Sequence, residues 1–255
     1  MKKNSILKLF VCLFVSLMAS SAFAQDGSIL GMPALTSSVG ENGEATYSLS
    51  LQILVLMTVL TLVPSIVLGM TAFTRVIIVL SILRQALGTQ QTPPNQVLIA
   101  IALFITFYVM SPIFEILYET ALNPYLEGTT SAQAALSIAT DLLKEFMVAN
   151  TRSSTMNMFA EMAGEGPFED TQAIPLSIVL PSFITSELKT AFEIGFLIFM
   201  PFLVIDFVIA SILMSLGMMM LSPMLISLPF KLLLFVLVDG WAMTIGSLSS
   251  TFVVG

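Results

Sequence analysis

The stretch PSFITSELKTAFEIGFLIFMPFLVIDFVIASILMSLGMMMLSP, residues 181–223, decides the fold of this chain. It is almost entirely apolar, yet it carries four charged residues, Glu187, Lys189, Glu193 and Asp206. A carboxylate near the centre of a bilayer costs on the order of 2.5 kcal/mol or more. We therefore expect these charges to face protein, water or the membrane interface. The apolar side chains then face other helices as well as lipid.

The composition is that of a membrane protein, because 56% of the 255 residues are hydrophobic and only 10% are charged. The chain has no His, and its single Cys, Cys12, lies in a segment that we expect to be removed. It has no phosphate-binding loop, no dinucleotide fingerprint, no nucleophile elbow and no metal-ligand spacing. The sequence therefore predicts a protein that is not an enzyme and that uses no cofactor and no metal.

Residues 1–24 have the features of a cleaved signal peptide. A basic start precedes a short apolar core, and Ala22-Phe23-Ala24 forms an A-x-A cleavage site. The alternative is an uncleaved first transmembrane helix, but the apolar core is short for a membrane span. Cleavage leaves six basic and 16 acidic residues, a formal net charge of −10. Such an acidic chain is a poor partner for nucleic acid, because binding there depends on Lys and Arg contacts to phosphate.

Residues 25–46 are rich in Gly, Ser and Thr without a period, which predicts a flexible N-terminal segment. Residues 47–118 predict a first helical hairpin. Pro64 and Gly69 offer a kink or break in its first arm, and the GTQQTPPN sequence at 88–95 supplies the turn.

Residues 119–180 form a more polar insertion, which hydropathy assigns to the periplasm with the N-terminus. A capping box that begins at Thr130 predicts one helix, and a second is expected over residues 153–163. Phe146 and Phe159 are the candidates for a contact with a neighbouring subunit. Packing of these two helices on one another is an equally good interpretation.

Residues 181–255 predict a second helical hairpin, bent at Gly195 and Pro201, with a methionine-rich connection between its arms. The sequence as a whole predicts an all-α, membrane-associated fold: two long kinked helical hairpins and a small periplasmic helical insertion.

Arg75 and Arg84 lie nine residues apart in the first hairpin. One interpretation is that they anchor a cytoplasmic turn by the positive-inside rule. The other is that they pair between helices with a carboxylate such as Glu115 or Asp206.

The three consecutive methionines, Met218, Met219 and Met220, cannot all lie on one face of a helix, so some are expected to project from a loop. Several subunits presenting this loop on a shared axis would form a deformable apolar ring. Hydrophobic constrictions of this kind can exclude ions and water. The alternative is that the methionines fill gaps between helices.

Glu187 and Lys231 each begin an apolar block after a turn. They could pair within the hairpin or between neighbouring subunits; alternatively, both lie at the membrane interface. Asp206 is a buried charge with two interpretations, a proton-relay carboxylate or a hydrogen-bonded structural acid. The second is favoured, because no further acid or His accompanies it.

The chain resembles the FliP family of flagellar type III export-gate proteins, whose injectisome counterparts are of the SctR type. The resemblance covers roughly residues 47–254 and is weakest over 120–175. It departs from the family pattern at Ser182, where Ala is usual, and at Ser222, where a second Pro is frequent. The segments that carry it are PSFITSELKTAFEIGF (181–196), PFLVIDFVIASILMSLGMMMLSP (201–223), FKLLLFVLVDGW (230–241), FTRVIIVLSILRQALGTQQTPPNQVL (73–98) and ALFITFYVMSPIFE (102–115).

This resemblance implies a helical ring of about five copies with small hydrophobic subunits of the FliQ and FliR type, in the bacterial inner membrane or on its periplasmic side at the flagellar basal body. It implies that the ring is a channel for unfolded export substrates. It also places the family's methionine-rich pore loop on Met218, Met219 and Met220. The alternative function is a proton- or ion-coupled secondary transporter that uses Asp206.

Overall fold

The structure is a computed structural model that describes residues 28–29, 32–33, 35–39, 45–49, 51–89, 92–166, 168, 171–218 and 221–253. The predicted signal peptide, residues 1–24, lies outside these ranges. The chain divides into two compact units, residues 1–64 and residues 65–255, and each is considered by itself.

The first unit contains two short antiparallel strand pairs. β1 (Ser28–Ile29) pairs with β2 (Met32–Pro33), and β3 (Leu35–Val39) pairs with β4 (Ala45–Leu49). The segment 25–46, predicted from the sequence to be flexible, thus contains short strands, and its flexibility stays a prediction. β3 and β4 contain residues with high strand propensity, including Val39 and Tyr47, which the surrounding Ser and Gly obscured in the sequence. The apolar helix α2 (Leu51–Gly69) follows, with Pro64 inside it.

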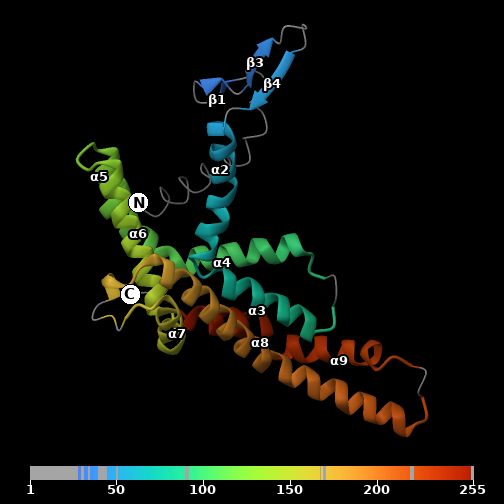
Figure 1. Cartoon of the computed structure of the whole chain (residues 1–255). Coiled ribbons are helices and arrows are strands. Elements are labelled where there is room, and N and C mark those ends of the chain that lie inside the picture. The colour runs from blue at the N-terminus through green and yellow to red at the C-terminus, as the bar shows by residue number, and fades with distance from the viewer. Residues whose placement is uncertain are drawn as a thin grey trace. The chain divides into compact units, whose positions relative to one another are not determined.

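The second unit is helical (Figure 1). α8 is its longest element, and α3, α6, α7 and α9 all contact it. Figure 1 shows α3 beside α4, and α9 beside the second half of α8. The elements are α3 (Phe73–Ala86), α4 (Asn95–Leu117), η2 (Tyr118–Leu122), α5 (Asn123–Leu126), α6 (Ala132–Ala149), α7 (Ser153–Ala163), η3 (Thr171–Ala173), α8 (Leu176–Ser215), α9 (Pro223–Leu237) and α10 (Gly240–Ser250).

α8 is a single helix of 40 residues that begins at Leu176, ahead of the predicted start of the second hairpin at 181. It continues through Gly195 and Pro201, the predicted bend positions, without a break. A proline inside a helix in an apolar setting is tolerated where neighbouring helices compensate for the lost hydrogen bond. Gly195 serves a close contact: a Cβ there would overlap Cδ1 of Ile82 on α3.

Helix breaks occur in two other apolar stretches, residues 51–86 and 223–250. In the first, α2 ends at Gly69 and α3 begins at Phe73. The last block divides into α9 and α10, which are bent by 64° around Val238 and Asp239. Asp239 adopts the left-handed conformation, with φ 49°. Gly240 follows it directly, where a Cβ would overlap the ring of Phe235.

The insertion forms the two predicted helices, with one correction at a cap. Ser131, not Thr130, caps α6: its Oγ accepts a hydrogen bond from the Ala134 N–H at 3.2 Å. Thr130 is engaged in the preceding turn, where its N–H donates to the Pro124 carbonyl. α7 covers the predicted residues 153–163 and ends at Gly164 in the left-handed conformation.

Among the residues that the structure describes, two helical segments are suited by length and composition to cross a membrane, Asn95–Leu126 and Leu176–Ser215; up to four spans result if each bent pair is counted as one. The prediction of a helical, membrane-associated fold is confirmed, with the four short strands as an addition. The main core lies where α3, α4, α6 and α8 meet, and it includes Leu80, Met110, Met147 and Phe183.

Candidate functional site

A buried ion pair joins α3 to α8. Nε of Arg75 donates to Oε2 of Glu187 at 2.9 Å, and Nη2 donates to Oε1 of the same carboxylate. The remaining nitrogen, Nη1, donates to the carbonyl and the hydroxyl of Thr251 at 3.0 and 2.9 Å. Arg75 is 3% exposed and Glu187 is fully buried. The bidentate geometry and the additional acceptors compensate for removing both charges from water.

A second ion pair joins α8 to α9. Nζ of Lys231 donates to Oδ2 of Asp206 at 2.6 Å and to the Ala86 carbonyl at 3.1 Å. Ser227 donates its hydroxyl proton to Oδ1 of Asp206 at 2.6 Å. Lys231 is 3% exposed, whereas Asp206 is 36% exposed. This environment is that of the hydrogen-bonded structural acid considered for Asp206 from the sequence.

The predicted pairing of Glu187 with Lys231 is corrected within the chain, since each has a different partner. Glu187 pairs with Arg75 on α3, and Lys231 pairs with Asp206 on α8. Glu187 and Asp206 are 19 residues apart on α8, a separation of about 28 Å. Lys231 packs near Asp206 and therefore lies far from Glu187 along α8. Arg75 does pair between helices, although with neither Glu115 nor Asp206.

Arg84 stabilises the turn between α3 and α4. Its Nη1 donates to Oδ1 of Asn95 at 2.6 Å and to the Pro93 carbonyl at 3.2 Å. A third ion pair, Arg152 with Glu193, lies at the surface where the α6–α7 turn meets α8. No local pattern in the sequence singles out Arg152, because its partner lies 41 residues away in a different element.

The methionine-rich connection joins α8 to α9 in the second unit. α8 ends at a left-handed Gly217, and the Met218 N–H donates to the Leu213 carbonyl at 3.0 Å, a Schellman arrangement. Met218 lies in this connection and is 46% exposed. Met219 and Met220 lie outside the described residues. The pore-ring role of the three methionines stays a prediction.

Phe146 is an interior residue of the chain, which corrects its expected role at a subunit contact. It is 4% exposed, and its ring lies edge-on to Phe183 with the centroids 5.9 Å apart. Phe159 is partly buried against the same core. The contacts of Phe146 and Phe159 therefore lie within the chain, and they arise because α6 and α7 both pack on α8.

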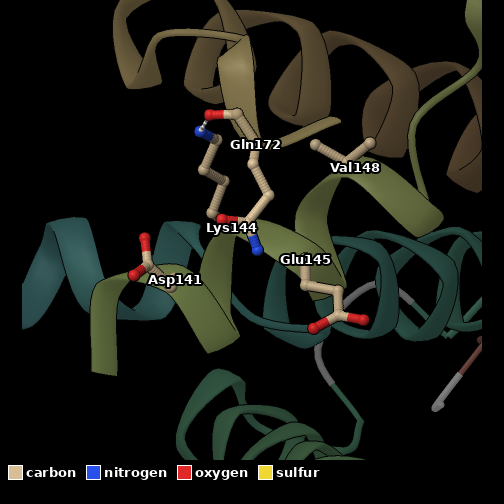
Figure 2. Close-up of a pocket in the computed structure, with 5 residues that line it drawn as sticks. All are labelled: Asp141, Lys144, Glu145, Val148 and Gln172. Carbon is tan, nitrogen blue, oxygen red and sulfur yellow. Dashed lines mark hydrogen bonds between the residues drawn. The ribbon is translucent and has the colours of Figure 1, made fainter. Parts of the chain in front are cut away.

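A small pocket of about 70 Å³ lies on α6 (Figure 2). Its lining consists of Asp141, Lys144, Glu145 and Val148 from α6 and Gln172 from η3, and Lys144 donates to the Gln172 carbonyl at 2.7 Å. Pockets for small molecules are several times larger. Among the residues that the structure describes, no group of three or more His, Cys, Asp or Glu is placed to hold a metal ion.

The three ion pairs described above thus each join different elements, and the long apolar helices keep large apolar side chains exposed. These features define a helical membrane protein with internally paired charges. The FliP family model matches residues 56–248, and the chain belongs to the FliP family. The flagellar biosynthetic protein FliP of Cereibacter sphaeroides is 64% identical over 222 residues, which cover 87% of this chain and 73% of the relative.

Two further relatives share the name flagellar biosynthetic protein FliP. The protein of Pectobacterium carotovorum is 48% identical over 235 residues, which cover 92% of this chain and 89% of the relative. The protein of Bacillus subtilis is 49% identical over 217 residues, which cover 85% and 96%, respectively.

Proposed function

We propose that this chain is a component of the flagellar export apparatus, and specifically a core channel-forming subunit of the type III export gate. In this role, several copies surround a passage for unfolded export substrates during flagellum assembly. The family membership carries the coarser part of the proposal. The finer part, a shared passage, is supported by the apolar surface of α8.

α8 is too long for a simple membrane span. Its 40 residues extend about 60 Å, twice the roughly 30 Å of a hydrocarbon core. Large apolar side chains on it are nevertheless exposed, including Phe192 (61%), Phe196 (62%) and Phe207 (66%). Lipid cannot cover the whole length of such a helix, so neighbouring protein must cover the rest.

The proposed assembly is a homo-oligomer of about five copies with small hydrophobic subunits of the FliQ and FliR type. It lies in the bacterial inner membrane or on its periplasmic side, at the flagellar basal body, with residues 119–180 toward the periplasm. Met218, Met219 and Met220 form its apolar constriction. The exposed position of Met218, three residues after the end of α8, supports this assignment.

Native mass measurement of the detergent-extracted protein tests the proposal. The chain is expressed with its companion subunits, and the expected result is one large complex that contains several copies of it. A particle with one or two copies and no partner would contradict a shared passage.

The alternative, a proton- or ion-coupled transporter, depends on Asp206. A relay carboxylate must exchange its proton, whereas Asp206 accepts hydrogen bonds from Lys231 and Ser227. Replacement of Asp206 by Asn discriminates the two functions. Under the export-gate proposal it weakens the α8–α9 contact and hence assembly; under the transporter alternative it abolishes coupling in a normally assembled protein.

A further inference from the structure

The last residues of α10 continue into a short segment, Thr251–Val253, that we name the C-terminal strap. Its first residue supplies two acceptors to Arg75, the backbone carbonyl and the side-chain hydroxyl. Its second residue, Phe252, is 8% exposed and lies with its ring 3.9 Å from the guanidinium carbon of Arg75. The strap therefore completes the surroundings of the buried cation on α3.

The third strap residue pairs with the end of α6. The Val253 N–H donates to Oδ1 of Asn150 at 3.0 Å, and Nδ2 of Asn150 donates back to the Val253 carbonyl at 2.9 Å. Nδ2 also donates to the Phe146 carbonyl, so the same side chain caps α6. The reciprocal pair imitates one step of a strand ladder. It joins residues 103 positions apart, at the turn between α6 and α7.

The two attachments differ in how easily they separate. The contact with Asn150 consists of two hydrogen bonds between neutral groups, and Val253 is 58% exposed. The Arg75–Glu187 pair beneath it is buried and keeps two of the three guanidinium nitrogens engaged without any help from Thr251. If the strap leaves its site, Nη1 of Arg75 loses its Thr251 acceptors and Phe252 becomes exposed, whereas Nε and Nη2 of Arg75 keep Glu187 as their partner.

We propose that the C-terminal strap is a conformational latch. When docked, it fixes the end of α10 to the α6–α7 turn and to Arg75. When it is released, α10 and the α6–α7 turn become free to move independently, while α3 and α8 remain joined through Arg75 and Glu187. This inference concerns the fold of residues 65–255 alone and does not depend on the proposed export function.

Hydrogen exchange of the full-length chain in detergent, followed by mass spectrometry, tests the latch. In the wild type the Val253 amide is expected to be protected. Asn150→Ala removes both strap hydrogen bonds and is expected to accelerate exchange at Val253 by roughly tenfold or more. Asn123→Ala is the matched control, because Asn123 bonds Glu127 at the surface and does not touch the strap. An unprotected Val253 in the wild type, or an unchanged rate in Asn150→Ala, would overturn the proposal.

Two shortened chains provide a second test. A chain that ends at Ser250 lacks the strap, and exchange in α10 and in residues 149–153 is expected to accelerate, or the chain to be degraded. A chain that ends at Val253 keeps the strap and is expected to behave as the wild type. Unchanged exchange in the Ser250 chain contradicts the latch. So does a loss of accumulation that the two chains share, since it would not depend on residues 251–253.

Discussion

Arg75 on α3 and Glu187 on α8 are 112 residues apart in the sequence and form a bidentate ion pair with almost no exposure to solvent. The pair fixes the position of α3 along α8 near the α6–α7 turn. Lys231 and Asp206 do the same for α9 farther along α8. These two ion pairs thus attach α3 and α9 to α8.

Removal of one partner of the buried pair should be far more damaging than removal of both. Arg75→Ala leaves the Glu187 carboxylate buried without its cation, at an expected cost of roughly 3–5 kcal/mol in the free energy of unfolding. The double variant Arg75→Met with Glu187→Leu leaves no buried charge and should recover most of that loss. Thermal unfolding in detergent, followed by circular dichroism, measures both. Arg152→Ala is the control, because its surface pair with Glu193 should contribute nothing measurable.

Lys231 is expected to act through its contacts with Asp206 and the Ala86 carbonyl. Lys231→Met removes the cation from Oδ2 of Asp206 and from the Ala86 carbonyl, with an expected loss of about 1–3 kcal/mol, while Ser227 still donates to Oδ1 of Asp206. Adding Asp206→Asn should then cost little more, because the carboxylate has already lost its cation. A thermodynamic double-mutant cycle gives the coupling between the two positions. Independent, additive losses would show that the ion pair does not stabilise the α8–α9 contact.

Gly195 should not tolerate a side chain, because α3 approaches α8 closely there. Gly195→Ala places a methyl group against Cδ1 of Ile82, and we expect destabilisation by roughly 1–3 kcal/mol. Ile82→Ala in the same chain removes the overlapping atom and should restore part of the stability. Gly246→Ala, in open space on α10, is the control and should be neutral or stabilising. Equal unfolding temperatures for the Gly195 and Gly246 variants would contradict the close helix contact.

Phe146 and Phe159 should differ in what they stabilise. Phe146→Ala removes a buried ring that packs on Phe183, and the expected loss is about 3–5 kcal/mol in the unfolding of a single chain. Phe159→Ala should cost less, because Phe159 is only partly buried. Unfolding is measured on dissociated chains at low concentration in detergent. A Phe146 variant that unfolds normally but fails to assemble would restore the subunit-contact interpretation.

The methionine constriction predicts a leak. Replacing Met218, Met219 and Met220 together by Ala shortens three side chains in the α8–α9 connection, without affecting the ion pairs that join the helices. We expect assembly to persist and the passage to conduct small ions. Conductance of the purified complex in planar bilayers measures this, with Met243→Ala on α10 as a control that also removes an exposed methionine. An ion-tight triple variant would exclude the constriction role.

The helical hairpins were predictable because uninterrupted apolar blocks and the Gly88–Asn95 turn are local signals. The positions at which the helices begin, bend and end were less predictable. Pro201 and Gly195 predict a bend from the sequence, but α8 continues through both residues, and Gly195 serves the close approach of Ile82 on α3. The bend between α9 and α10 at Asp239 was not predicted, because an Asp in the left-handed conformation has no distinctive sequence signal.

Glu187, Lys231 and Asp206 each take part in an ion pair, but Glu187 and Lys231 do not pair with one another, and Asp206, expected to be a buried charge, is 36% exposed. Glu187 and Lys231 look equivalent in the sequence because each begins an apolar block. Their partners are set by where α3 and α9 lie along α8, and no local pattern encodes that position. For the same reason, nothing in the sequence linked Asn150 to Val253.

The length of α8 has a mechanical consequence. A helix that runs unbroken from Leu176 to Ser215 transmits rotation from one end to the other. A tilt of roughly 5° about its first turn would displace its last turn by about 5 Å, close to one helical pitch. Small rearrangements around the first turn of α8 would thus become large movements at its far end, three residues before Met218.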